Sequence, residues 1–491
     1  MAHRVNLRAR GAYHFTYSGR CVLITDLAGR VGEQDPLGLY VDNVRLLSRL
    51  EVSVNGKSPR PMSASPVGGD AFLAYEELPQ ADGLPRESVY LETARFVGEG
   101  MRTVLRLRNY GPEEARCELA IHLAADFADS QEAEQQQRQQ NAEVETTWDH
   151  AAAELTFRYR HPQLDRGVAI RVERSPEPAH WREGALWLQL ELPPRGSAEL
   201  ELAVEPLVDG RRIACTSRRL FGQPEAPLER LRADLADEMP RLTSSNATVV
   251  KTWETATCDL ASLPYGLPDG PATPSAGLPL YLQFFGRDSL TIGWQTLMAT
   301  PTLLRDSLVA NAAWRGRRID DWLDEEPGKM IHQARGGPLS VLGIDPFTRY
   351  YGDWATPPDF LIMLGQYLAW TGDRETIRSL LPAARDALDW CERYGDPDGD
   401  GFLEYDTRSP KGVKNQGWKD SGDAVVDEHG AIVPNPIATS ELQAYWYAGL
   451  QQAALVFAAT GDVGYAAQLL GKARDLRRRF NDVFWMPELG A

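Results

Sequence analysis

The chain has 491 residues, of which 43% are hydrophobic and 25% are charged, as in a folded protein of about two to four domains. Its 52 basic and 69 acidic residues give a net charge of −17, which argues against nucleic acid or an anionic membrane as a partner. No apolar run reaches the roughly 18 residues of a transmembrane helix. Residues 1–10 lack the apolar core of a signal peptide, so we expect a cytoplasmic protein.

Cysteine and histidine patterns do not indicate a metal site or a disulfide framework. The five cysteines are isolated and odd in number, and the eight histidines are scattered without metal-ligand spacing. The sequence also lacks the phosphate-binding, dinucleotide-binding and serine-hydrolase motifs. We therefore expect a reduced chain with no cofactor and no metal.

Residues 1–222 show the period-two alternation of an antiparallel β-sandwich. Leu50, Val52 and Val54 alternate with polar residues and precede Asn-Gly at 55–56, a strong hairpin signal. Apolar residues alternate again at 186–192 and 200–204, which predicts strands with one wet and one buried face. The glutamine-rich stretch 131–141 is expected to be an exposed loop or a frayed helix.

From residue 223 the pattern changes to long segments of helical periodicity between proline-bearing loops. After a helical linker at 223–245, we expect helices that include 360–371, 375–394, 441–459 and 465–484. Thr-Gly-Asp, Leu-Leu and Arg-Asp recur at a constant offset in 371–386 and 460–475. In each copy Gly would end one helix, Asp would begin the next and the leucine pair would be buried. Such a repeated helical hairpin predicts a curved or closed helical array.

The segment 415–423, Asn-Gln-Gly-Trp-Lys-Asp-Ser-Gly-Asp, places a carboxylic acid beside an indole in a loop before a long helix. A sugar site needs a flat apolar surface for a pyranose ring and a carboxyl group that can protonate a leaving oxygen. Trp418 and Asp420 could supply both. From spacing alone, Asp420 and Asp423 could equally be solvated loop acids.

Three further clusters mix aromatic, charged and turn-forming residues at loop–helix junctions. They lie at 284–290 (Phe-Phe-Gly-Arg-Asp-Ser-Leu), 325–329 (Glu-Glu-Pro-Gly-Lys) and 350–357 (Tyr-Tyr-Gly-Asp-Trp-Ala-Thr-Pro). Arg287 and Asp288 offer fixed donors and acceptors for vicinal hydroxyl groups. Each cluster alone can be structural, but several in one domain favour a concave carbohydrate site.

On these motifs the chain resembles the bacterial glycogen-debranching, amylo-α-1,6-glucosidase family. The resemblance covers nearly the whole chain and rests on 38–49, 125–129, 285–290, 326–329 and 417–423. That family joins an N-terminal β-sandwich to an (α/α)6 barrel of the glucoamylase type. The resemblance therefore implies a sandwich at 1–222, a helical linker at 223–245 and a barrel beginning at 246.

The resemblance also implies roles for individual residues. Arg287 and Asp288 would hold the non-reducing glucose, and Asp420 would be the general acid. Other contacts to the substrate would come from Phe285, Tyr351, Trp354, Trp418, Lys419, Asp423 and Glu441. Because a general acid must keep its proton, Lys419 is expected to point away from Asp420 or to pair with Asp423.

The chain departs from the family pattern at two places. The family usually has an aspartate directly before Ala-Thr-Pro, where this chain has Trp354, with Asp353 one place earlier. An inverting glycosidase also needs a base roughly 6.5–9.5 Å from the acid. In the family that glutamate lies well downstream, so we expect the base beyond residue 491 and an incomplete barrel at 246–491. Glu441, the best remaining carboxylate, is expected to contact substrate or cap a helix.

The predicted function is an inverting hydrolase of α-glucosidic bonds, possibly the α-1,6 branch of a glycogen limit dextrin. The predicted partner is an α-glucan or oligosaccharide. A glycoside phosphorylase and a non-catalytic glucan-binding protein stay open, and the sequence does not fix the oligomeric state. Asp396, Asp398 and Asp400 begin like a calcium loop, but its twelfth position is Thr407, and an Asp- and Gly-rich turn explains the same residues.

Overall fold

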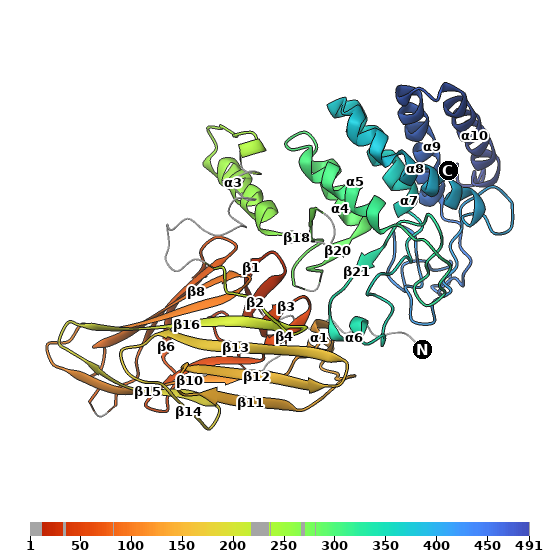
Figure 1. Ribbon diagram of the computed structural model, residues 1–491. Helices are drawn as coiled ribbons and strands as arrows, with labels where there is room; N and C mark the ends of the chain where they lie inside the picture. Colours follow the sequence, from red (N-terminus) through yellow and green to blue (C-terminus); the bar gives the residue numbers. More distant parts are fainter. Residues whose placement is uncertain are drawn as a thin grey trace.

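The computed structural model describes residues 12–32, 36–81, 83–217, 235, 237–266, 271–279 and 281–490. Figure 1 shows a lobe of β-sheets, coloured red to yellow, beside a lobe of helices, coloured green to blue. The predicted order, antiparallel sheets first and helices afterwards, is confirmed. The boundaries at residues 222 and 245 stay predictions, and most of the expected linker lies outside the described residues.

Strands of the first lobe form three larger antiparallel sheets in the part of the chain described. One has the order β1 (His14–Ser18), β2 (Cys21–Thr25), β3 (Gly38–Val41) and β4 (Val44–Leu47). The second has the order β14 (His180–Arg182), β15 (Ala185–Leu192), β10 (Ala115–Ala124) and β5 (Arg49–Val54). The third runs β11 (Val144–Asp149), β12 (Glu154–His161), β13 (Leu164–Arg174), β16 (Ser197–Val208), β9 (Gly100–Asn109), β8 (Val89–Gly98), β7 (Ala71–Glu77) and β6 (Arg60–Pro66), with β17 (Arg211–Arg212) paired to β16.

Side-chain alternation explains why these strands stack into a sandwich. In β15 the four leucines at 186, 188, 190 and 192 are buried, while Gln189 and Glu191 between them are exposed. They join one hydrophobic core with leucines of β9, β10 and β16. Asn55 and Gly56 form the predicted tight turn with positive φ at both positions. However, β5 and β6 then join different sheets, so the turn is not a simple hairpin.

The helical lobe is built from paired helices. It contains α3 (Ala247–Ser262), α4 (Gly286–Thr296), α5 (Thr302–Trp314), α6 (Pro338–Val341), α7 (Thr356–Thr371), α8 (Arg374–Arg393), α9 (Ser440–Thr460) and α10 (Val463–Val483). Short strand pairs lie between them: β18 (Pro264–Gly266) with β19 (Ala272–Pro274), and β20 (Phe284–Phe285) with β21 (Gln333–Ala334). Helix α7 packs between α4 and α9, and α5, α8 and α10 each pack against the preceding helix of their pair. Helices α4, α5, α7, α8, α9 and α10 share one buried apolar core.

The predicted repeat corresponds to two helical hairpins. Gly372 and Gly461 end α7 and α9 in the left-handed region, with φ of 67° and 105°. Asp373 and Asp462 then cap α8 and α10 through backbone N–H groups. Of the leucine pairs, Leu380 and Leu469 are buried as expected, but Leu470 is 44% exposed. Leu381 is only partly buried and packs against the same core. A helix buries one stripe, so the second leucine of each pair lies at its edge.

The prediction for the glutamine-rich stretch was partly wrong. Residues 130–135 form helix α1 (Ser130–Gln135), and Glu132 within it is 1% exposed instead of solvated. Its carboxylate accepts hydrogen bonds from the backbone of Asp129, Gln139 and Gln140. The stretch is therefore an ordered, partly buried connection, because Glu132 satisfies the backbone groups of the loop that follows.

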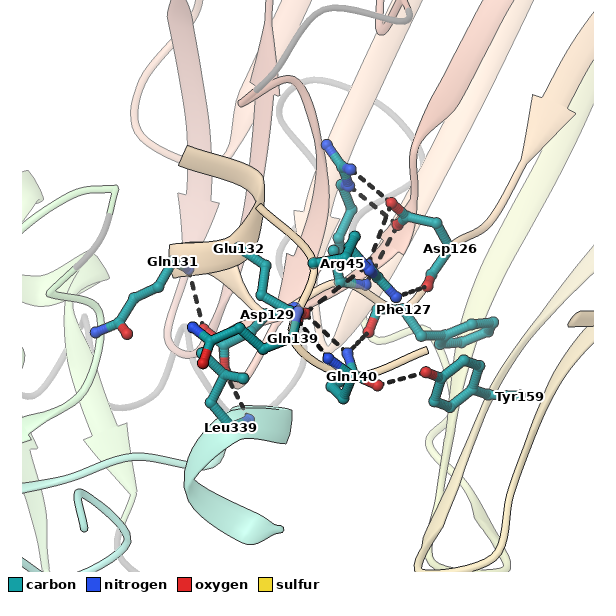
Figure 2. Close-up of polar contacts among 12 residues, drawn as sticks. Arg45, Asp126, Phe127, Asp129, Gln131, Glu132, Gln139, Gln140, Tyr159 and Leu339 are labelled. Carbon is teal, nitrogen blue, oxygen red and sulfur yellow. Dashed lines mark hydrogen bonds and ion pairs between the residues drawn. The ribbon is translucent and has the colours of Figure 1, made fainter. Parts of the chain in front are cut away.

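Residues from the two N-terminal family-like motifs meet each other in this region. Arg45, from 38–49, binds Asp126, from 125–129, through two nitrogen–oxygen contacts of 3.0 and 2.5 Å. Figure 2 shows this pair together with Asp129, which lies between α1 and Leu339 of α6. The carboxylate of Asp129 also binds Arg335, so the second motif links the sandwich to the helical lobe.

None of the helices in the described ranges is long and apolar enough to cross a membrane. All five cysteines are free, as the sequence predicts. Cytoplasmic location itself stays a prediction. Leu235 and Met239, within the expected linker, pack against Ala261 and Leu303.

Candidate active site

Arg287 is the centre of the candidate site, where three segments distant in sequence converge. It lies in the first turn of α4, and 7% of its surface is exposed. Its guanidinium donates to the carbonyl of Gly417 at 2.9 Å and to Oδ2 of Asp420 at 3.2 Å. Its Nη1 also lies 2.9 Å from Oδ2 of Asp353. Residues of the motifs at 284–290, 350–357 and 415–423 therefore meet around Arg287.

Local backbone structure fixes the position of Arg287. Strand β20, directly before α4, pairs with β21, and the N–H of Gly286 donates to the carbonyl of His332 at 2.8 Å. A Cβ at position 286 would lie 2.0 Å from the carbonyl oxygen of Ile331. Only glycine permits this close approach, so the strand pair and the helix start form one tight unit.

Asp353 combines a structural role with contact to the arginine. Its Oδ1 accepts the N–H groups of Ala355 and Thr356, at 2.8 and 3.1 Å, at the start of α7. Its Oδ2 faces Arg287. Burial raises the pKa of Asp353, although Arg287 opposes the shift. Asp353 lies one residue before the position where the family usually has an aspartate, and it still contacts Arg287. Trp354, which occupies that position, packs in the core.

The loop that carries Asp420 is held by amide side chains. Asn415 donates from Nδ2 to the carbonyl of Ser421 at 2.6 Å, which closes the loop around Trp418 and Asp420. Gln416 accepts the N–H of Trp354 with its backbone carbonyl at 2.7 Å, and its side chain binds the buried Asp324. The two amides therefore set where the loop places its acid.

Trp418 provides an aromatic surface next to the charged groups. Its side chain is 48% exposed, and the guanidinium carbon of Arg287 lies 5.1 Å from its ring centre. The ring of Tyr445, from α9, lies nearly parallel to it at 6.3 Å. An exposed indole next to a cation and a second ring can stack on an apolar sugar face.

Several predicted site residues lie near this centre. Asp288 follows Arg287 in the first turn of α4, and burial raises its pKa while Arg287 opposes the shift. Glu441 lies in the first turn of α9, and its Oε1 is 3.4 Å from the Cβ position of Gly417. Glu441 makes no capping hydrogen bond in the described part of the chain, so the contact role remains the better prediction.

Other predicted residues lie in the protein interior. Tyr351 is 3% exposed and donates its hydroxyl to the carbonyl of Trp314 at 3.0 Å, so it presents no open face. Trp354 is 4% exposed and packs edge-on against Trp390. Phe285 is 8% exposed and packs against Tyr281 and His332. These side chains support the site from within the fold.

Lys419 and Asp423 are exposed, and neither makes an ion pair within the described residues. No ion pair between Lys419 and Asp420 is found in the described part of the chain either. The alternative in which Lys419 pairs with Asp423 is not observed. Neither residue is drawn into the cluster around Arg287.

Three buried or half-buried residues of the site were missed from the sequence: Asp359, Tyr445 and His332. Burial raises the pKa of Asp359 to about 8 and that of Tyr445 to about 12. Burial is the main cause that lowers the pKa of His332 to about 3, and the positive charge of Arg287 is the second cause. Asp359 follows two prolines at a helix start. Acids are common at this position because the partial positive charge of a helix N-terminus stabilises them, so the sequence contained no sign of a further role.

The beginnings of α4, α7 and α9 carry three of the acids near Arg287. Asp288, Asp359 and Glu441 each lie in the first turn of their helix. Because helix N-termini carry partial positive charge, they stabilise carboxylates and orient N–H donors toward a polar ligand. The pockets on the face of the sandwich and beside α10 are lined by other residues. The side chain of Asp420 is 44% exposed.

The acidic turn at 396–400 does not require a metal to explain it. Carboxylate oxygens of Asp396, Asp398 and Asp400 lie within 4.8 Å of one another. Asp396 accepts the N–H groups of Gly399 and Gly401, both at 2.8 Å, and Asp398 accepts that of Asp400. Side chains that satisfy their own backbone are typical of turns.

Comparisons with known proteins agree with the resemblance. Residues 17–203 match the N-terminal domain of (some) glycogen debranching enzymes. No curated protein sequence matches the chain. The fold is similar to a protein assigned as a kojibiose phosphorylase from the human microbiome, at a TM-score of 0.57 and 9% identity over 95% of this chain and 67% of that one. It is also similar to a bacterial glucoamylase complexed with acarbose, at a TM-score of 0.52 and 10% identity over 97% of this chain and 69% of that one.

The expected fold class is thereby confirmed: antiparallel sheets followed by the helical array of α/α-barrel glycosidases and phosphorylases. At this identity the two solved structures establish the fold alone. The resemblance to the debranching family is confirmed through its N-terminal domain.

Proposed function

We propose that this protein is a glycoside hydrolase that cleaves α-glucosidic bonds, with the α-1,6 branch points of glycogen or a limit dextrin as its substrate. The observation that carries the proposal is the 3.2 Å contact between Asp420 and Arg287 beside the exposed ring of Trp418. The substrate class is supported by the glycogen debranching domain at 17–203.

Arg287 and Asp288 would bind hydroxyl groups of the terminal glucose, and Trp418 would cover one face of its ring. A guanidinium fixed by Gly417 and two carboxylates presents donors in a defined direction. Binding energy from these groups would hold the anomeric carbon close to Asp420. Glu441, at the start of α9, would contact the sugar from the other side of Gly417.

Asp420 would act as the general acid of a single displacement. Its proton passes to the glycosidic oxygen as the bond from that oxygen to the anomeric carbon breaks. A water attacks the same carbon from the opposite face, and a second carboxylate at that face, not assigned among the described residues, accepts its proton. The product is β-glucose. Because Oδ2 of Asp420 lies 3.2 Å from the Arg287 cation in the free site, the half-exposed side chain has to turn away from Arg287 and toward the substrate before it can donate a proton.

The test uses the full-length gene product with a branched limit dextrin, isomaltose and maltotriose. We expect release of β-glucose, seen by proton NMR before mutarotation, with the limit dextrin as the preferred substrate and no requirement for inorganic phosphate. Release of glucose 1-phosphate that depends on inorganic phosphate would show that the protein is a phosphorylase and not a hydrolase. Binding of glucan without turnover would leave a glucan-binding protein.

A further inference from the structure

Asp359 has a position that the general features of helix starts do not explain. It lies in the first turn of α7 and is 2% exposed. The N–H groups at the start of this helix are already served by Asp353, which accepts those of Ala355 and Thr356. Residues 357 and 358 are prolines and have no N–H, so the carboxyl group of Asp359 is not needed as a cap.

One oxygen of the Asp359 carboxyl group also lacks a partner. Its Oδ2 is buried, and within the described residues no hydrogen-bond donor or acceptor pairs with it. Leaving a buried polar atom unpaired costs free energy, so such atoms are rare in folded proteins and are frequent where a ligand completes them.

The surroundings of Asp359 belong to the candidate active site. The charges of Arg287 and Asp353 both act on it, and its own charge acts on Tyr445 of α9. Two other buried polar atoms near the site motifs, Nδ1 of His332 and Oε1 of Gln416, also have no partner in the part of the chain described. A site with more buried donors and acceptors than internal partners fits a ligand that carries many hydroxyl groups.

We propose that Asp359 is a specificity-determining residue that hydrogen-bonds one hydroxyl group of the terminal sugar. The inference rests on the proposed function and deepens it, because it assigns recognition of a sugar hydroxyl to a residue outside the motifs that suggested the site. A site built to bind a hydroxyl group rejects an analogue that lacks it, since its own buried polar atom is then left unpaired.

The test compares α-glucosyl fluoride with its four monodeoxy analogues (at carbons 2, 3, 4 and 6) on the wild-type full-length protein, Asp359→Leu and Asp359→Asn. We expect one deoxy position to lower kcat/KM by roughly ten- to hundredfold on the wild type. On Asp359→Leu this one penalty should disappear while the other three stay unchanged, and Asp359→Asn should keep part of it. Asp306→Leu, which removes an acid of α5 that binds Arg305, serves as the control and should keep the wild-type pattern.

A purely structural role would lower activity on all five substrates in parallel, and that result would overturn the inference while leaving the proposed function intact. If the wild-type protein cleaves none of the fluorides and binds no α-glucoside by calorimetry, the proposed function fails and the inference fails with it. Misfolding of Asp359→Leu would be seen in its thermal unfolding. In that case the penalties of the four deoxy analogues are compared between the wild type and Asp359→Asn.

Discussion

Asp129 and Arg335 form a buried ion pair between the β-sandwich and the helical lobe, with 2.8 Å between Oδ1 and Nη2 and side-chain exposures of 0% and 2%. Arg335 also donates to Gln283, directly before β20, and β20 leads into Arg287. The sandwich is thus connected to the candidate active site through a few contacts. Figure 2 shows how α1 and α6 enclose the aspartate.

Replacing Asp129 with alanine should destabilise the protein by about 3–5 kcal/mol, because the buried Arg335 would lose its nearer carboxylate and keep only Asp345, at 3.5 Å. The measurement is chemical denaturation monitored by circular dichroism. Asp475→Ala, which breaks the exposed pair with Arg478, should change the free energy of unfolding by less than about 1 kcal/mol. Equal effects of the two substitutions would contradict the importance of this interface.

Gly286→Ala should reduce both stability and activity. The new Cβ would lie 2.0 Å from the carbonyl oxygen of Ile331 and 2.8 Å from Oδ1 of Asn311, so the start of α4 would have to shift. We expect a loss of about 1–3 kcal/mol, the usual cost of overpacking. Gly471→Ala in α10 meets no atom within 4 Å and should stabilise the protein by about 0.5–1 kcal/mol. Thermal unfolding of both variants distinguishes these outcomes.

Arg287→Lys should lower kcat/KM on α-glucosides by at least about 100-fold. Lysine keeps the charge but cannot contact Gly417, Asp353 and Asp420 together, because it lacks the planar fork of arginine. Steady-state kinetics should show this loss with little change in unfolding temperature. Arg318→Lys, at a side chain 67% exposed, is the matched control and should leave kcat/KM unchanged.

The pKa of Asp359 predicts a pH dependence of stability. Burial raises this pKa from 3.8 to about 8, so the folded protein binds a proton that the unfolded chain releases above pH 4. The stabilisation from this proton is complete below pH 4 and is lost as the pH rises toward 8. Asp359→Asn cannot titrate, so its free energy of unfolding should fall less between pH 5 and 8 than that of the wild type. Parallel curves would mean that Asp359 titrates as an ordinary surface acid.

Features set by neighbouring residues could be predicted from the sequence. Gly372 and Gly461 end their helices as expected, because the left-handed conformation is a local requirement. The alternation at 186–192 likewise gave the correct buried face. Local patterns could not show how Glu132 is buried, because the helix and loop around it close on its carboxylate only in the folded chain.

The candidate site was only partly predictable. Arg287 and Asp420 are 133 residues apart, and the family resemblance, not spacing, brought them together. Asp359 was missed because an acid in the first turn of a helix is common and its burial depends on α4 and α9. Tyr351 was assigned to the sugar, but its hydroxyl group binds Trp314 inside the core. In each case the deciding contact is distant in sequence.

The central claim, that Asp420 donates the proton to the leaving oxygen, is tested most directly by comparing two substrates on Asp420→Asn in the full-length protein. Fluoride leaves α-glucosyl fluoride without needing a proton from an acid, whereas the sugar oxygen of a branched limit dextrin needs one. The proposed mechanism predicts that Asp420→Asn loses at least about 1,000-fold in kcat on the dextrin and keeps most of its activity on the fluoride. Wild-type turnover of the dextrin by this variant would contradict it.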